Sequence, residues 1–334
     1  MFLPVIYFII GLLLLIKGGD WFVDGSTGIA RRFHVPDLLI GATVVSIGTT
    51  LPEVMVSATS ALGGHGEIAY GNAIGSIICN TALIAALTIA IRPSKVDKST
   101  LKLPVIFFFG AAAFYALNAY INRKFTRASG VVLLLIFALY MYLTVSQARK
   151  ISAKDPAAAG AGSPGSAEGS AAASENVGSM AKDILLLVIG AVLIAIGADL
   201  LVDNGTIIAQ ELGVPESVIA LTFVALGTSL PELVTAITSL AKGHGALSLG
   251  NIIGANLFNL VLVSGISTTL APFDVPCSKT IAGMNASLVV DIPLMLFVMA
   301  FLTLPALKRE KLTRAQGIIL LAIYAAFCVF QFML

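Results

Sequence analysis

The sequence repeats itself at an offset of 179 residues, and this duplication constrains the fold more than any other feature. Residues 20–80 align with residues 199–259 without a gap, and 26 of the 61 aligned positions are identical. Both segments contain the motif Gly-Thr-Thr/Ser-Leu-Pro-Glu, which runs from Gly48 to Glu53 and again from Gly227 to Glu232. Because internal duplication dictates architecture, we expect two copies of one structural unit.

The composition predicts that each unit lies in a membrane. Hydrophobic residues make up 57% of the chain, charged residues 11%, and the mean hydropathy is +0.97, whereas about a quarter of the residues in a soluble domain are charged. A run of about 20 apolar residues is long enough to cross a bilayer. We therefore predict an all-α integral membrane protein with ten transmembrane helices, over residues 3–30, 37–62, 68–91, 103–121, 128–146, 183–209, 215–241, 246–271, 286–306 and 315–333.

The spans divide into two repeats of five, residues 1–150 and 183–334, joined by a flexible Ala/Gly/Ser-rich linker over 151–182. Placing the N-terminus outside puts 15 Lys and Arg in inner loops and 4 in outer loops, as the positive-inside rule requires. We expect a cell (plasma) membrane protein with both termini outside and a cytoplasmic linker. Because five is odd, the second repeat enters the membrane from the opposite side, which is the inverted arrangement of secondary transporters.

Glu53 and Glu232 both fall inside predicted spans. A carboxylate costs roughly 2.5–3.5 kcal/mol there, so such a residue indicates a functional site. Pro52 and Pro231 each remove a helical hydrogen bond and free a carbonyl one turn earlier, and hydroxyls recur at helical spacing around Glu53. Carboxylates, hydroxyls and carbonyls are the oxygen ligands of hard cations such as Ca²⁺. One divalent ion would balance the two glutamates.

Polar residues at four-residue spacing also mark one face of the next helix in each repeat. These are Asn72, Ser76 and Asn80 in the first repeat, and Asn251 and Asn259 with Ala255 between them in the second. For the four asparagines the alternative to an ion-binding role is hydrogen bonding between helices. The pairs Gly71 with Gly75 and Gly250 with Gly254 predict close helix packing.

Together these motifs resemble the two α-repeats of the calcium/cation antiporter superfamily, over residues 37–83 and 216–262, and the chain is similar to prokaryotic sodium/calcium exchangers. The resemblance implies Ca²⁺/Na⁺ exchange by alternating access, with the first and sixth spans sliding as a pair. It also implies ion ligands. These are the carboxylates of Glu53 and Glu232, the hydroxyls or carbonyls of Thr49, Thr50, Thr228 and Ser229, the backbone carbonyls of Ser46 and Ala225, and the side chains of Ser76 and Asn80.

Two positions depart from the family pattern. Ala255 stands where many relatives have a serine ligand, which puts one Na⁺ site in doubt. Asn259 stands where several prokaryotic relatives have an aspartate, which removes a proton-carrying group from the cluster. The runner-up functions are H⁺/Ca²⁺ exchange and K⁺-dependent cation/Ca²⁺ exchange.

Other classes of protein receive less support. A cation channel would need a filter loop that the sequence lacks, and an enzyme is not expected because no nucleophile stands beside a base. We expect no cofactor. The predicted partners are the transported ions Ca²⁺ and Na⁺ and the lipid bilayer, with no nucleic acid and no obligatory protein partner.

Charged residues near the ends of the spans allow two interpretations. The pairs Asp20 with Asp24 and Asp199 with Asp203 are either solvated helix ends or cation-attracting vestibules. His65 and His244 are either loop residues or pH sensors.

Overall fold

The computed structural model describes residues 2–33, 35–154, 179–211, 227–277, 280–281 and 283–333. Helices dominate the described part of the first half. They are α1 (Phe2–Arg32), α2 (Asp37–Ile40), α3 (Ser46–Leu62), α4 (Gly66–Cys79), α5 (Ala86–Ile91), α6 (Lys98–Leu117) and α7 (Arg127–Lys154), with the π-helical segments η1 (Gly41–Val45), η2 (Asn80–Ala85) and η3 (Asn118–Asn122). A short strand, β1 (Lys124–Phe125), lies between η3 and α7.

The described part of the second half is also helical. It contains α8 (Met180–Glu211), α11 (Leu230–Ala241), α12 (Gly245–Phe258), α13 (Ser264–Leu270), α14 (Ile292–Arg309) and α15 (Arg314–Met333), with the π-helical segments η6 (Asn259–Val263) and η7 (Ser287–Asp291). Strand β2 (Phe273–Asp274) pairs with β1, and β3 (Thr280–Ile281) pairs with β4 (Met284–Asn285), both antiparallel.

The observed spans agree with the predicted ones. Within the described residues, nine helical stretches are long and apolar enough to cross a membrane, and Leu230–Ala241 forms a shorter apolar helix. The predicted span over 37–62 coincides with the observed one, while the predicted span over 215–241 is described only from residue 227. Helix α6 begins at Lys98 instead of residue 103, because the Asp97 side chain accepts a hydrogen bond from the Ser99 amide (2.8 Å) and caps it.

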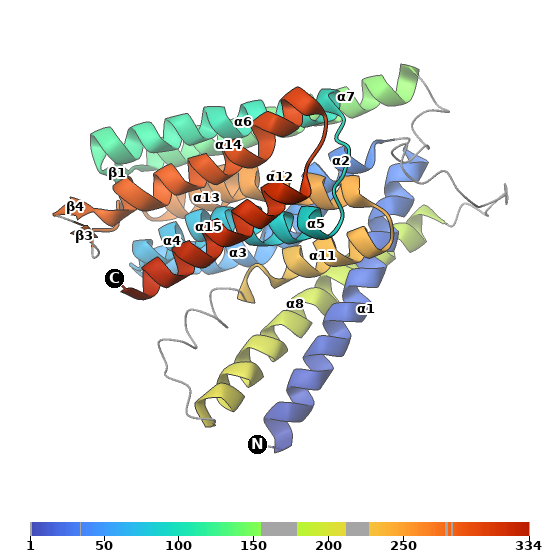
Figure 1. Cartoon of the computed structure of the whole chain (residues 1–334), viewed down its shortest axis with the longest axis horizontal. Coiled ribbons are helices and arrows are strands. Elements are labelled where there is room, and N and C mark those ends of the chain that lie inside the picture. The colour runs from blue at the N-terminus through green and yellow to red at the C-terminus, as the bar shows by residue number, and fades with distance from the viewer. Residues whose placement is uncertain are drawn as a thin grey trace.

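Helices α1 and α8 form a pair that lies to one side of the other helices (Figure 1). Glycines allow the two backbones to touch. A Cβ atom built on Gly190 would lie 2.5 Å from the amide nitrogen of Phe22 and 2.8 Å from the carbonyl oxygen of Gly18. Arg32 of α1 also forms an ion pair with Asp183 of α8 at 3.1 Å.

An ion pair ties α1 to the rest of the bundle. Lys242, which follows α11, contacts Asp24 at 2.7 Å and Asp20 at 3.4 Å. The two aspartates are partly exposed but lie within α1, which continues to Arg32, so they are not at a helix end. Their partner Lys242 was not foreseen from the sequence.

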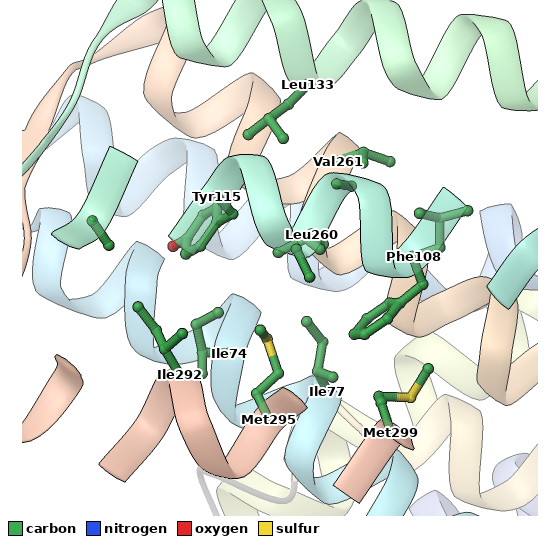
Figure 2. Close-up of a cluster of buried hydrophobic side chains, with 14 of the residues drawn as sticks. Ile74, Ile77, Phe108, Tyr115, Leu133, Leu260, Val261, Ile292, Met295 and Met299 are labelled. Atoms are coloured by element: carbon green, nitrogen blue, oxygen red, sulfur yellow. The ribbon is translucent and has the colours of Figure 1, made fainter. Parts of the chain in front are cut away.

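A large apolar cluster holds the remaining helices together. Figure 2 shows α4, α6 and α14 meeting there through side chains that include Ile77, Phe108 and Met299, with Leu260 of η6 among them. Lipid tails are as apolar as leucine, so such a cluster stabilises the bundle through close packing more than through exclusion of water. The spans Gly66–Ile91 and Gly245–Leu270, which contain the predicted ligands Asn80 and Asn259, are the two most buried of the described spans.

The two repeats have matching local structure around their motifs. Adding 179 to the bounds of α4 gives those of α12, and the π-helical segments that follow begin at the equivalent Asn80 and Asn259. The preceding turns match as well, with Gly64 and Gly243 at φ values of +83° and +82°. Short π-helical segments inside α-helices are frequent at functional sites.

Candidate cation-binding site

Two fully buried carboxylates form the centre of the site. Glu53 lies in the middle of α3 and Glu232 in the first turn of α11, each 0% exposed, and the two interact electrostatically. Within the described residues, none of their four carboxylate oxygens has a hydrogen-bond partner and no basic side chain pairs with them. The two carboxylates are therefore buried without a compensating positive charge among the described residues.

Proline shapes the backbone differently in the two motifs. Pro52 lies inside α3, which continues through it. Pro231 lies in the first turn of α11 after Ser229, the residue that precedes the helix, where its missing N–H costs nothing. Two motif hydroxyls, Thr50 Oγ1 and Ser229 Oγ, are buried without a partner among the described residues. They are available as oxygen ligands.

Asn80 and Asn259 are also buried without partners. Each is 0% exposed, and none of their four amide nitrogen and oxygen atoms forms a hydrogen bond to a described residue. Hydrogen bonding between helices, the alternative interpretation of these two residues, is therefore not observed. Ser76 is buried one turn before Asn80, and the equivalent Ala255 is 0% exposed and has no hydroxyl to offer.

Asn72 and Asn251, in contrast, do form hydrogen bonds between helices. The Thr49 hydroxyl donates to Oδ1 of Asn251 at 3.2 Å, and the Thr228 hydroxyl donates to Oδ1 of Asn72 at 3.3 Å. The Ser46 hydroxyl has its shortest contact, 2.7 Å, with the Gly41 carbonyl of its own helix, and it also lies 2.9 Å from the Asn251 carbonyl and 3.3 Å from its Oδ1. The structure thus brings Ser46, Thr49 and Thr228 against the third helix of the opposite repeat.

The remaining predicted residues lie apart from this centre or outside the description. Ala225 lies outside the described residues. His65 is exposed in its turn, and His244 contacts Asp37 of α2 at 2.9 Å. Gly250 and Gly254 pack closely, as predicted, against Leu38, Ala42 and Ser46. The same prediction for Gly71 and Gly75 is wrong, because no described atom lies within 4 Å of a Cβ atom built at either position.

The chemistry of this centre is that of a hard-cation site. No group of three or more His, Cys, Asp or Glu side chains occurs in the part of the chain that the structure describes, so an ion would be held by two carboxylates together with neutral oxygens. Buried unpaired carboxylates are expensive, and oxygen donors suit Ca²⁺ better than they suit thiolate-preferring metals. The arrangement can bind a cation or take up protons.

The helical bundle, its duplicated motif and this buried oxygen-rich centre define a polytopic membrane transporter. Comparison with known proteins makes the class specific. The sequence pattern of the sodium/calcium exchanger protein family matches residues 3–146 and 182–333. An uncharacterized membrane protein of Methanocaldococcus jannaschii is 36% identical over 324 residues, which is 96% of each chain.

Two named exchangers are similar over nearly their whole length. The sodium/calcium exchanger MaX1 of Methanosarcina acetivorans is 29% identical over 351 residues, 97% of each chain. The structure of the sodium-calcium exchanger NCX_Mj, soaked with Na⁺ and Sr²⁺, superposes with a TM-score of 0.79 at 34% identity and covers 97% of each chain. The chain therefore belongs to the sodium/calcium exchanger protein family, and the predicted superfamily and all-α membrane fold are confirmed.

Proposed function

We propose that the protein is an antiporter that exchanges Ca²⁺ for Na⁺ across the membrane by alternating access. The observation that carries this proposal is the pair of buried carboxylates, Glu53 and Glu232, which have no basic partner among the described residues. Membership of the exchanger family supports it, as does the likeness to NCX_Mj.

The proposed ligands surround this pair. We assign Ca²⁺ and Na⁺ coordination to oxygens of Glu53, Glu232, Thr49, Thr50, Thr228 and Ser229, with contributions from the backbone carbonyls of Ser46 and Ala225 and from Ser76, Asn80 and Asn259. The side chains of Thr50, Ser229, Asn80 and Asn259 have no partner among the described residues, which supports this set, because buried polar atoms normally have partners. A bound cation would supply them.

Competition for one set of oxygens explains coupling. One Ca²⁺ neutralises both carboxylates, so Na⁺ cannot occupy the same oxygens at the same time. If the protein reorients only when the carboxylates are neutralised, each ion moves in exchange for the other. The close-packed α1 and α8 pair, which lies beside the other helices (Figure 1), is the element we propose to slide during this reorientation.

The decisive experiment is ⁴⁵Ca²⁺ uptake into proteoliposomes under an outward Na⁺ gradient. Glu53→Gln and Glu232→Gln should each reduce uptake to the level of protein-free vesicles, because each removes a buried charge that balances Ca²⁺. Glu67→Gln is the matched control, since Glu67 is exposed in the first turn of α4 and should transport normally. Full uptake by either buried variant would remove the proposed site.

The coupling ion needs a separate measurement. Uptake that depends on Na⁺ and is indifferent to a pH gradient would support the proposal. Uptake driven by a proton gradient in vesicles without Na⁺ would favour H⁺/Ca²⁺ exchange, since protons can also neutralise buried carboxylates. An additional requirement for K⁺ would identify a K⁺-dependent exchanger.

We further propose that the chain lies in the cell membrane with both termini outside. The excess of Lys and Arg in loops that would face the cytoplasm supports this orientation. Residues 1–150 and 183–334 are then the two inverted repeats, with the linker in the cytoplasm.

A further inference from the structure

Two asparagines connect the repeats through a reciprocal pair of hydrogen bonds. Thr49 of the first motif donates to Asn251 of the second repeat at 3.2 Å, and Thr228 of the second motif donates to Asn72 of the first at 3.3 Å. The offset of 179 relates the two threonines and also the two asparagines. Each motif is thus held by the third helix of the opposite copy.

We propose that Asn72 and Asn251 are positioning residues, which orient Thr228 and Thr49 for cation binding without themselves binding the ion. The proposal rests on the function proposed above. The hydroxyl of threonine has one proton and two lone pairs. When the proton is donated to an asparagine oxygen, both lone pairs can face a cation and no proton points at it.

The surroundings of Asn72 and Asn251 differ, which makes the proposal specific. The side-chain nitrogen of Asn72 donates to the Ser57 hydroxyl at 2.8 Å and to the Glu53 carbonyl at 3.1 Å, so its own repeat fixes the amide. The side-chain nitrogen of Asn251 has no partner among the described residues: Ala236 offers no hydroxyl at the position equivalent to Ser57, and no bond forms to the carbonyl of Glu232, the residue equivalent to Glu53.

The side chain of Asn251 is held through its oxygen instead of its nitrogen. Its Oδ1 accepts the Thr49 hydroxyl at 3.2 Å and lies 3.3 Å from the Ser46 hydroxyl, whose shortest contact is the Gly41 carbonyl at 2.7 Å, and the residue is 0% exposed. Asn72 therefore needs its donor group to be in place, whereas Asn251 needs only its acceptor oxygen. Substitutions that remove one of these functions should affect the two asparagines differently.

Double-mutant cycles test the reciprocal contacts, with the KM and maximal rate of ⁴⁵Ca²⁺ uptake as readouts. We expect Asn72→Ala, Asn251→Ala, Thr49→Val and Thr228→Val each to raise the KM about tenfold, which corresponds to about 1.4 kcal/mol. The effects of substituting two residues in contact should not be additive. The KM of the double variant Thr49→Val with Asn251→Ala, and that of Thr228→Val with Asn72→Ala, should therefore lie within about threefold of the KM of the more impaired single variant. In the crossed pairs, Thr49 with Asn72 and Thr228 with Asn251, the two effects should be independent, so the KM of each double variant should rise about a hundredfold.

Asn118→Ala is the control for loss of a buried asparagine. Its side-chain nitrogen donates to the Phe114 carbonyl within the same helical segment, so the KM should not change. Equal coupling in contacting and crossed pairs, or a lowered maximal rate at an unchanged KM, would show that the two asparagines serve packing alone and would overturn the proposal.

Aspartate variants separate the two asparagines and cover the case in which an alanine variant does not fold. Aspartate keeps an accepting oxygen and loses the amide donor, and both variants add the same charge. We expect Asn72→Asp to have a KM about tenfold above that of Asn251→Asp, and the opposite order would contradict the inference.

If Glu53→Gln transports normally, the proposed function fails. If that variant is inactive while the asparagine variants behave as wild type, only this inference fails.

Discussion

At the scale of single residues, the site is not symmetric. The side-chain nitrogen of Asn72 donates two hydrogen bonds, whereas the side-chain nitrogen of Asn251 is buried and donates none to the described part of the chain. A buried donor without a partner costs about 1–3 kcal/mol. Ala236→Ser would place a hydroxyl where the first repeat has Ser57 and should raise stability by about 1 kcal/mol.

The reverse substitution, Ser57→Ala, should lower stability by about 1 kcal/mol, because Asn72 loses one of its acceptors. Thermal unfolding in detergent measures both effects, with Ser60→Ala, on the same helix, as control. Unfolding temperatures that shift in the same direction for Ala236→Ser and Ser57→Ala would show that the hydroxyl does not act through the asparagine.

The two buried carboxylates were predictable because the duplication marks them. Glu53 and Glu232 are carboxylates in apolar runs, and repetition excluded coincidence for both. The bond from Thr49 to Asn251 was not predictable, because it depends on which helix of one repeat faces which helix of the other. The partners of Lys242 were missed for the same reason, since Asp24 lies on α1, more than 200 residues away.

At the scale of elements, the contact between α1 and α8 depends on glycine. A side chain at Gly190 would meet the backbone of Phe22 at 2.5 Å and that of Gly18 at 2.8 Å, and backbone cannot move aside as a flexible side chain can. Gly190→Val should therefore separate the helices and cost about 1–3 kcal/mol, the typical cost of overpacking. The temperature of thermal unfolding and the initial rate of ⁴⁵Ca²⁺ uptake should both fall.

Gly110→Val is the matched control, because no described atom lies within 4 Å of a Cβ atom built at Gly110. It makes the same change within helix α6 and should leave uptake intact. Normal uptake by Gly190→Val would show that close contact between α1 and α8 is dispensable for transport.

Hydropathy was sufficient to locate the helices but not their local irregularities. The span over 37–62 was predicted to the residue, since apolar runs and polar turns bound it clearly. The π-helical segments at Asn80 and Asn259 were not foreseen, because the periodicity of side chains over a single turn does not distinguish them from an α-helix. The start of α6 was misplaced because polar residues in the capped first turn resemble a loop.

At the scale of the whole molecule, the direction in which each helix crosses the membrane is the prediction with the most consequences. Cys277 is exposed in the segment after β2. Strand β2 pairs with β1, which follows the end of the span Lys98–Asn122. Cys277 therefore lies at the opposite end of this span from Lys98, on the side that we propose to be outside.

A membrane-impermeant maleimide added to intact cells should label Cys277, because Cys79 is buried and Cys328 only partly accessible. Cys277→Ser should abolish the label. In that background Lys98→Cys, at an exposed position, should react only after the membrane is permeabilised. Labelling of Lys98→Cys in intact cells, together with no labelling of Cys277 in the wild-type chain, would show the inverted topology, in which the basic loops face outward against the positive-inside rule. The carboxylate pair would keep its place between the repeats in either orientation, since exchanging inside and outside leaves the contacts between the two halves unchanged.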